Sequence, residues 1–182
     1  PNFTAEALPV LESKKNRILL RQKEAIDARW SYRSMLGGVL AQETDRAVET
    51  TAEMKPVTKV APTAEELTDL VFATKLVKHS KSNAIVLSKG GQLIASGVGQ
   101  TSRVDALKQA IEKARHFGFD LKGAVLASDA FFPFDDCVTL AAEAGITAIA
   151  QPGGSVRDAD SIAAADRLGV AMVMTGVRHF KH

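Results

Sequence analysis

The chain has 182 residues, which suits one globular domain or two small ones and is enough to bury a real core. A formal net charge of +2 provides no general basic field for nucleic acid, and no apolar run is long enough to cross a bilayer. One cysteine, Cys137, excludes an intrachain disulfide and fits a reducing cytoplasm.

The first third of the chain is difficult to close into a fold by itself. Thr4 can cap a short helix that runs to about Lys14. Residues 17–20, "RILL", and residues 35–42, "MLGGVLAQ", read as strands, and the second strand contains a Gly-Gly bend. Residues 43–62 are polar, so we expect a connector there.

After this connector the pattern becomes regular. Thr63 and Glu66 form a capping box at the start of an amphipathic helix. The tripeptide "KGG" separates two short apolar runs and predicts a hairpin over residues 83–99. Ser102 can cap the next helix, and Gly118 follows that helix as a stop signal.

The last third repeats one kind of unit. Apolar runs at residues 124–128, 148–151 and 171–175 read as buried strands, and helices are expected at about 136–144 and 159–168. Alternation of strand and helix predicts an α/β fold with a largely parallel sheet covered by helices.

Three loops follow these strands and are expected to meet at one edge of the sheet. They are "SDAFFPFDD" (128–136), "PGGSVRD" (152–158) and "GVRHFKH" (176–182). Ligands of open α/β sheets bind at the carboxyl ends of the strands. One loop is aromatic, one is glycine-rich and one is cationic, so together they favour a ligand with a flat ring and an anionic group.

Each loop also has a simpler interpretation. Phe131, Phe132 and Phe134 can all fill the core, with Pro133 only delaying the helix, or at least one ring can lie exposed as a stacking surface. The segment "QPGGS" can be an ordinary turn, or its backbone can approach an anion at a helix start.

Two polar residues have similar alternatives. Arg103 stands in the first turn of a helix, where a cation is mildly unfavourable, so it either meets an anion or is simply solvated. Asn83 opens a strand and either donates to an oxyanion or serves as a turn or cap residue.

A catalytic zinc of the deaminase type is excluded by the spacing of its ligands. Such a site needs a His/Cys-x-Glu stretch and a Cys-x-x-Cys pair. The chain has one cysteine, and no histidine precedes x-Glu. Nucleotide-binding glycine fingerprints and Walker A loops are absent from the sequence as well.

Four segments resemble a known family. They are "KSNAIVLSKGGQLIASGVGQTSRVDA", "ASDAFFPFDD", "QPGGSVRDADSIAAADRLGVAMV" and "TGVRHFKH". In this order and spacing they closely resemble the C-terminal end of the AICAR transformylase domain in the AICAR transformylase/IMP cyclohydrolase family. "PNFTAEALPVLESKKN" and "GGVLAQE" resemble preceding segments of that domain, so the resemblance covers nearly the whole chain.

The resemblance implies a fold and a reaction. The fold is a three-layer α/β/α, cytidine-deaminase-like unit without zinc, formed here by residues 61–182. Residues 1–60 resemble the tail of the preceding subdomain and a connector. The reaction is transfer of a formyl group from 10-formyltetrahydrofolate to the 5-amino group of AICAR, in the cytoplasm.

The resemblance also carries over site residues, position by position. Asn83 resembles the asparagine that contacts the formyl group. Arg103, Phe131 and Arg178 resemble residues that contact AICAR. Folate-side residues are expected at Val104, Pro133, Phe134, Asp136 and Ser155. Asp129 is the acid we carry over for a structural potassium ion.

The chain departs from the family pattern in one important way. The family's catalytic pair lies in a Lys-His-x-x-Pro-x-Gly context, which this sequence lacks. Lys78-His79 looks like that pair, but its context differs, and we expect His79 to pack or cap instead. Because the chain begins with Pro1, we expect a fragment or processed product.

Three hypotheses therefore stand at this point. The chain is part of a transformylase that is inactive or nearly so alone, and that works as a homodimer together with a missing N-terminal half. Alternatively, it is one chain of an active split enzyme. A third possibility is a non-catalytic binding or regulatory module that kept the fold.

Overall fold

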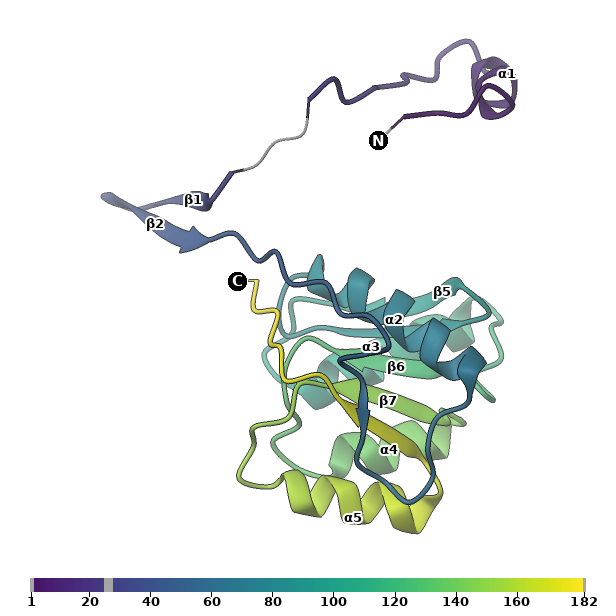
Figure 1. Cartoon of the computed structure of the whole chain (residues 1–182), viewed down its shortest axis with the longest axis vertical. Helices are drawn as coiled ribbons and strands as arrows, with labels where there is room; N and C mark the ends of the chain where they lie inside the picture. The colour runs from purple at the N-terminus through teal and green to yellow at the C-terminus, as the bar shows by residue number, and fades with distance from the viewer. Residues whose placement is uncertain (1, 25–27, 182) are drawn as a thin grey trace. The chain divides into compact units, whose positions relative to one another are not determined.

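A computed structural model describes residues 2–24 and 28–181 (Figure 1). The chain divides into two compact units, Pro1–Arg46 and Ala47–His182. Each unit is described by itself below. Among the described residues, no helix combines the length and the apolar character that a membrane span requires.

The first unit contains a short helix and a hairpin. Helix α1 (Ala7–Glu12) is followed by strands β1 (Trp30–Met35) and β2 (Gly38–Glu43), which pair antiparallel. Every residue of both strands is exposed, including large apolar side chains. The described part of this unit therefore has secondary structure without a core of its own.

The sequence predictions for the first unit were only partly right. The helix is shorter than expected, although the Thr4 hydroxyl accepts a hydrogen bond from the backbone N–H of Ala7 (3.3 Å). Residues 17–20 form no strand. The predicted strand at 35–42 is a hairpin instead, because Leu36 and Gly37 form a two-residue turn and Gly38 begins the returning strand. A strand with a Gly-Gly bend and a hairpin with a Gly-containing turn leave similar sequence patterns.

The second unit is built on a six-stranded sheet with the order β3-β8-β7-β6-β4-β5. Strands β5 to β8 run in one direction, while β3 and β4 run in the opposite direction, so the sheet is mixed and largely parallel as expected. Its elements are β3 (Lys55–Pro56), α2 (Ala64–Lys78), β4 (Ile85–Lys89), β5 (Gln92–Gly97), α3 (Arg103–His116), β6 (Val125–Ser128), α4 (Asp136–Ala144), β7 (Ala148–Gln151), α5 (Asp158–Leu168) and β8 (Ala171–Met174).

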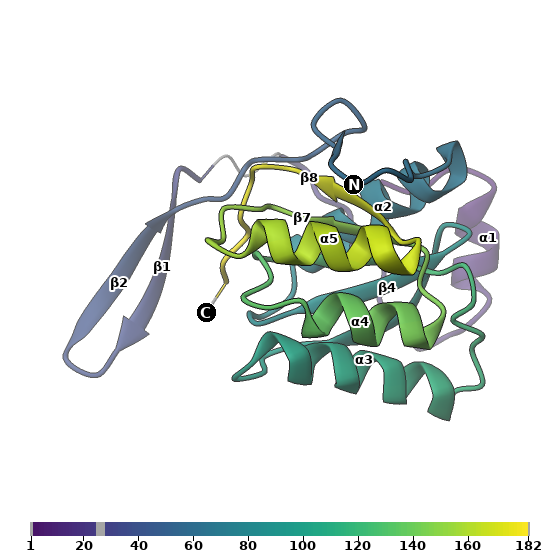
Figure 2. The same cartoon turned by 90° about the horizontal axis from the view of Figure 1, so that it is seen from below.

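Helices cover both faces of this sheet. Helices α3, α4 and α5 lie along one face, and α2 covers the other (Figure 2). Strand β4 and the residue before it show how the sequence creates two cores: Ile85 and Leu87 belong to the larger core, while Ala84 and Val86 belong to the smaller one. Successive strand residues point to opposite faces, and both faces are buried here. The predicted three-layer α/β/α architecture is confirmed.

The predicted helix ends are also confirmed. The Thr63 hydroxyl accepts from the backbone N–H of Glu66 (3.2 Å), and the Glu66 carboxylate accepts from the N–H of Thr63 (2.8 Å). The Ser102 hydroxyl caps α3 by accepting from the N–H of Asp105 (3.2 Å). Gly118 follows α3 with a φ of +74°, a left-handed conformation that favours glycine.

The expected connector is part of the second unit rather than a free linker. The contact boundary between the two units falls after residue 46, so residues 47–60 of the expected connector lie in the second unit. Met54 is buried, and Lys55–Pro56 pairs with β8 as the edge strand β3. Proline is compatible with an edge strand because only one side of that strand forms ladder hydrogen bonds. Glu49, a charged residue that polarity alone places in solvent, is buried to 2% exposure.

Candidate functional site

The three loops predicted to meet do lie at one edge of the sheet. Strands β6, β7 and β8 are parallel neighbours, so their carboxyl ends share that edge. The loop after β6 is joined to β7 by the N–H of Phe132, which donates to Oε1 of buried Gln151 (3.1 Å). It is joined to the tail after β8 by the N–H of His179, which donates to the carbonyl of Asp129 (2.9 Å).

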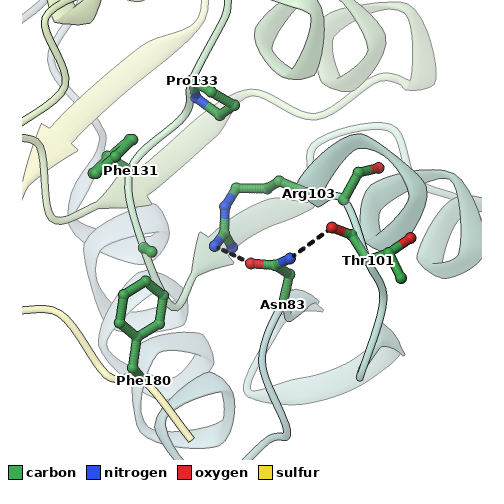
Figure 3. Close-up of a pocket in the computed structure, with 8 residues that line it drawn as sticks. Asn83, Thr101, Arg103, Phe131, Pro133 and Phe180 are labelled. Atoms are coloured by element: carbon green, nitrogen blue, oxygen red, sulfur yellow. Dashed lines mark hydrogen bonds between the residues drawn. The ribbon is translucent and has the colours of Figure 1, made fainter. Parts of the chain in front are cut away.

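A pocket of about 310 Å³ opens beside this edge. Figure 3 shows the rings of Phe131 and Phe180 on one side, with Arg103 and Asn83 hydrogen bonded to each other across from them. We call it the Asn83 pocket; it is lined by Asn83, Thr101, Ser102, Arg103, Ala130, Phe131, Pro133 and Phe180. Four of the predicted site residues are therefore brought together by the fold.

Arg103 is the most highly connected side chain of the pocket. It is only 6% exposed and forms an ion pair with the fully buried carboxylate of Asp129. Its guanidinium also donates to the Ser128 hydroxyl (2.9 Å) and to Oδ1 of Asn83 (3.0 Å). The sequence left open whether Arg103 meets an anion or is solvated, and the structure provides an anion within the chain, Asp129. Arg103 can add positive potential to the pocket, but its charge is already paired with Asp129.

Asn83 is oriented by three hydrogen bonds. Its Oδ1 accepts from Arg103, and its Nδ2 donates to the carbonyl of Gln100 (3.0 Å) and to that of Thr101 (3.3 Å). Both amide hydrogens are therefore in use. A ligand oxygen that takes a hydrogen bond from Asn83 must displace one of these carbonyls, and the longer bond to Thr101 is the one more easily replaced.

The loop between β6 and α4, called the Phe loop after Phe131, Phe132 and Phe134, serves two purposes at once. Phe132 is fully buried and belongs to the larger core, as the packing interpretation predicted. Phe131 is half-buried and lines the Asn83 pocket, while Phe134 is 52% exposed. Pro133, between these rings, is exposed and also lines the pocket. The loop is therefore anchored by one ring and presents two others outward.

Arg178 lies against the aromatic side of the pocket. Its guanidinium carbon is 5.8 Å from the ring centre of Phe131 and 5.0 Å from that of Phe180. A guanidinium within about 6 Å of an aromatic face is attracted by the ring quadrupole. Arg178 is exposed, so these contacts place a solvent-accessible cation beside the pocket.

The predicted folate-side residues are less tightly grouped. Exposed Phe134 lies under the guanidinium of Arg157 (5.1 Å to the ring centre), and Ser155 Oγ accepts from the N–H of Arg157 (3.1 Å). Asp136 is exposed at the start of α4, and Val104 packs partly against the larger core. Apart from Pro133, none of the predicted folate-side residues lines the Asn83 pocket.

The glycine-rich loop already contains an internal anion. Gly153 and Gly154 have φ values of +73° and +94°, and the N–H of Gly154 donates to Oδ2 of Asp158 (2.7 Å). Asp158 is the first residue of α5, where a negative charge is favourable. An added Cβ at Gly153 would lie 2.8 Å from the Met174 sulfur, so packing as well as conformation requires glycine there.

Lys78 and His79 lie at the end of α2. Nζ of Lys78 donates to the carbonyl of Ala47, and exposed His79 occupies the C-cap position of the helix. Neither residue lines the Asn83 pocket. The position of His79 agrees with a capping role.

Asp129 is the residue expected near a metal ion. Its Oδ1 accepts from Arg103 and from the N–H of Ala84 (3.2 Å), whereas its buried Oδ2 has no hydrogen-bond partner among the described residues. Within the described part of the chain, no group of three His, Cys, Asp or Glu side chains is arranged to hold a metal.

Cys137, which follows the loop between β6 and α4, is not a reactive nucleophile. Cys137 is buried in α4, and burial, followed by the negative charge of Asp136, raises the pKa of its thiol to about 12. Because the thiolate is the reactive form, this cysteine is not suited to covalent chemistry at neutral pH.

Sequence reasoning did not single out several residues of this surface. Phe180, Thr101 and Ser102 line the pocket, and Arg157 covers Phe134. For Phe180 a signal existed, because it lies two positions after Arg178 and such residues share one side of an extended segment. Arg157 gave no such signal, since its contact depends on how two loops fold together.

The fold and the pocket define an α/β protein with an aromatic and cationic pocket at the carboxyl ends of its parallel strands. A family model described as "AICARFT/IMPCHase bienzyme" matches residues 1–113, more than half of the chain. The chain belongs to this family.

Close relatives carry one common description, "Bifunctional purine biosynthesis protein PurH". The protein from Bacteroides thetaiotaomicron is 62% identical over 182 residues, covering 100% of this chain and 36% of the relative. Relatives from Acetivibrio thermocellus and Aquifex aeolicus are 54% and 50% identical, again over 100% of this chain and over 36% and 35% of their own lengths. The chain thus spans little more than a third of these purine biosynthesis proteins.

Solved structures with a partial likeness are deaminases. A dCMP deaminase from the cyanophage S-TIM5, in complex with dCMP and dUMP, has a TM-score of 0.43 and 19% identity over 61% of this chain and 98% of that chain. A bifunctional deaminase/reductase from Thermotoga maritima has a TM-score of 0.42 and 25% identity over 58% of this chain and 34% of that chain. Scores at this level support no inference about function.

Proposed function

We propose that this chain forms the C-terminal part of an AICAR transformylase. The parent enzyme transfers the formyl group of 10-formyltetrahydrofolate to the 5-amino group of AICAR, in cytoplasmic purine biosynthesis. The observation that carries the proposal is the Asn83 pocket, where Asn83, Arg103, Phe131 and Pro133 meet beside Arg178. These are the residues that the family resemblance assigns to the formyl group, the nucleotide and the folate.

The reaction needs a positioned amine and a stabilised oxyanion. The amine nitrogen of AICAR forms a bond to the formyl carbon, the bond from that carbon to the folate nitrogen breaks, and one proton passes from the amine to the leaving nitrogen. The tetrahedral intermediate carries a negative oxygen, which an oriented amide and nearby cations stabilise. In this chain, Asn83 supplies the amide, and Arg178 and the paired Arg103 supply positive potential.

Aromatic rings would position the two substrates. Phe131 and Phe180 offer apolar rings to the flat imidazole of AICAR, and Arg178, near both rings, offers donors to its phosphate. On the folate side, we assign the pterin to exposed Phe134 and Pro133, with Asp136, Ser155 and the backbone near Val104 as polar or packing contacts. Arg157 over Phe134 adds a cation there that suits an acidic folate tail.

The described residues of the pocket do not supply a proton-transfer pair. The described residues that line the pocket include no lysine or histidine, and Lys78 and His79 lie at the end of α2 instead. We therefore propose that the chain binds substrates but turns over only with the rest of the parent protein, and that the working form is a homodimer. In this proposal residues 1–60 are the tail of the preceding subdomain and a connector, and the exposed apolar hairpin β1–β2 packs against a part of the parent.

Asp129 is the residue we assign to a potassium ion. A buried carboxylate oxygen without a partner suits a cation, and Oδ2 of Asp129 has that property among the described residues. Arg103 already balances the charge of the carboxylate, so a monovalent ion fits this site better than a divalent one. The ion would stabilise the fold beside the pocket, and no proton or formyl transfer passes through it.

Calorimetry with AICAR and with folinic acid, a stable formylated folate, tests the proposal. The chain should bind both ligands, and formyl transfer should be measurable only after the remaining part of the enzyme is added. Binding of AICAR with no transfer in the reassembled enzyme would favour a non-catalytic module. No binding of either ligand by the chain or the reassembled enzyme would refute the proposed function.

A further inference from the structure

The tail after β8 borders the Asn83 pocket through Phe180, and its side chains at 178–180 alternate between exposed and buried. His179 is buried at 2% exposure, while its neighbours Arg178 and Phe180 are exposed and contact the pocket's aromatic side. In an extended segment, successive side chains point to opposite sides. Fixing His179 on the inner side therefore fixes Arg178 and Phe180 on the outer side.

Backbone hydrogen bonds hold this segment at two places. The N–H of His179 donates to the carbonyl of Asp129 (2.9 Å). Further along, the N–H of Lys181 donates to the Ser82 hydroxyl (2.9 Å), and the N–H of Ser82 donates to the carbonyl of Lys181 (2.8 Å). These bonds join the tail to the segments on either side of the pocket.

The inner side of the tail is held by a buried side-chain pair. Nε2 of His179 lies 3.0 Å and 3.1 Å from the two carboxylate oxygens of Glu49, and both side chains are 2% exposed. We assign Nε2 as the donor and the Glu49 carboxylate as the acceptor in this contact. Removal of the Glu49 carboxylate would take this acceptor away from a buried imidazole, which is unfavourable. Glu49 precedes β3, more than a hundred residues from the tail in sequence, so the pair joins two distant parts of the chain.

We propose that Glu49 and His179 form a latch that positions Arg178 and Phe180 at the Asn83 pocket. Neither latch residue lines the pocket, so both act through the tail and are positioning residues. Holding an exposed arginine and phenylalanine in place before the ligand arrives reduces the ordering cost of binding. The effect on AICAR rests on the proposed function, whereas the effect on tail mobility does not.

Three variants of the 182-residue chain test the latch by hydrogen exchange. Glu49→Ala removes the acceptor, Glu49→Gln keeps one acceptor oxygen without the charge, and Glu112→Gln is a control on the exposed surface of α3. For Glu49→Ala we expect exchange in a peptide covering residues 177–181 to rise about tenfold or more, with β6 unchanged, as for a local opening. Glu49→Gln should lie between the wild type and Glu49→Ala, and Glu112→Gln should match the wild type.

Other exchange patterns decide against the latch. Wild-type exchange of the tail in Glu49→Ala would overturn it. If Glu49→Ala also loosens β6, the isosteric Glu49→Gln decides: faster exchange confined to the tail supports the latch, and wild-type exchange in the tail overturns it.

AICAR affinity tests the positioning role through a double-mutant cycle. We expect Glu49→Ala to weaken AICAR binding about tenfold, and Arg178→Ala to weaken it at least as much. If Glu49 acts through the tail, Glu49→Ala/Arg178→Ala loses little more than Arg178→Ala alone. Fully additive losses, or unchanged affinity in Glu49→Ala, would overturn the positioning role. If the wild-type chain binds no AICAR, the assignment of AICAR to the pocket of the isolated chain fails, and the exchange experiment still decides on the latch.

Discussion

Breaking the buried pair of Arg103 and Asp129 on one side only should strongly destabilise the chain next to the pocket. In Asp129→Asn the side chain keeps its shape but loses its charge, so the guanidinium of Arg103 is left 6% exposed without a counter-ion. Breaking one partner of a buried pair costs about 3–5 kcal/mol. The Asn83 and Ser128 contacts of Arg103 remain, but they are neutral and do not balance its charge.

Urea unfolding followed by circular dichroism measures this loss. A matched control is Asp160→Asn, which removes the exposed Arg157–Asp160 pair (3.7 Å) and should cost no more than about 1 kcal/mol. A double variant, Arg103→Met/Asp129→Leu, replaces both charges by apolar groups and should be less destabilised than Asp129→Asn alone. If Asp129→Asn costs as little as Asp160→Asn, the idea that an unpaired buried charge dominates this region is refuted.

Further predictions concern the loops around the pocket. Phe132→Ala should lose about 3–5 kcal/mol of unfolding free energy, because this ring is fully buried. Phe134→Ala, at a half-exposed ring, should change the unfolding free energy by less than about 0.5 kcal/mol and still weaken folinic acid binding in calorimetry. An unfolded Phe134→Ala variant would contradict this prediction. Arg178→Ala should weaken AICAR binding about tenfold, while exposed Arg167→Ala should not, and equal affinities would count against the assignment of Arg178. Burial raises the pKa of the Cys137 thiol from its ordinary value of 9.0 to about 12, so the stability that depends on the neutral thiol is complete below about pH 9 and is lost as the pH rises toward 12. A thiol reagent at pH 8 should label Cys137 only as fast as the chain unfolds. Rapid labelling of the folded chain would disprove the burial of this thiol.

Much of the second unit could be predicted because local signals and packing agree there. The Thr63–Glu66 capping box, the "KGG" hairpin and the stop at Gly118 are short-range features, and each forms as the sequence indicates. Parallel neighbours β6, β7 and β8 then require their three following loops to meet at one edge. The position of the pocket follows from this topology.

What could not be predicted depends on contacts distant in sequence. Glu49 looks like a solvated connector residue until His179, from the other end of the chain, is folded against it. Arg103 looked available to a ligand anion, and only the fold shows that Asp129 already pairs with it. The hairpin β1–β2 was misjudged for another reason: every residue in its strands is exposed, so no burial pattern marks which face is inner.

The central claim is that AICAR binds in the Asn83 pocket of this chain. The most direct test is a titration of the ¹⁵N-labelled chain with AICAR, followed by the chemical shifts of its backbone amides. The account predicts shifts that cluster around Asn83, residues 101–103, residues 130–132 and residues 178–180. Saturable shifts located elsewhere, for example around Arg29 and Arg46 in the first unit, or no shifts at any AICAR concentration, would contradict it.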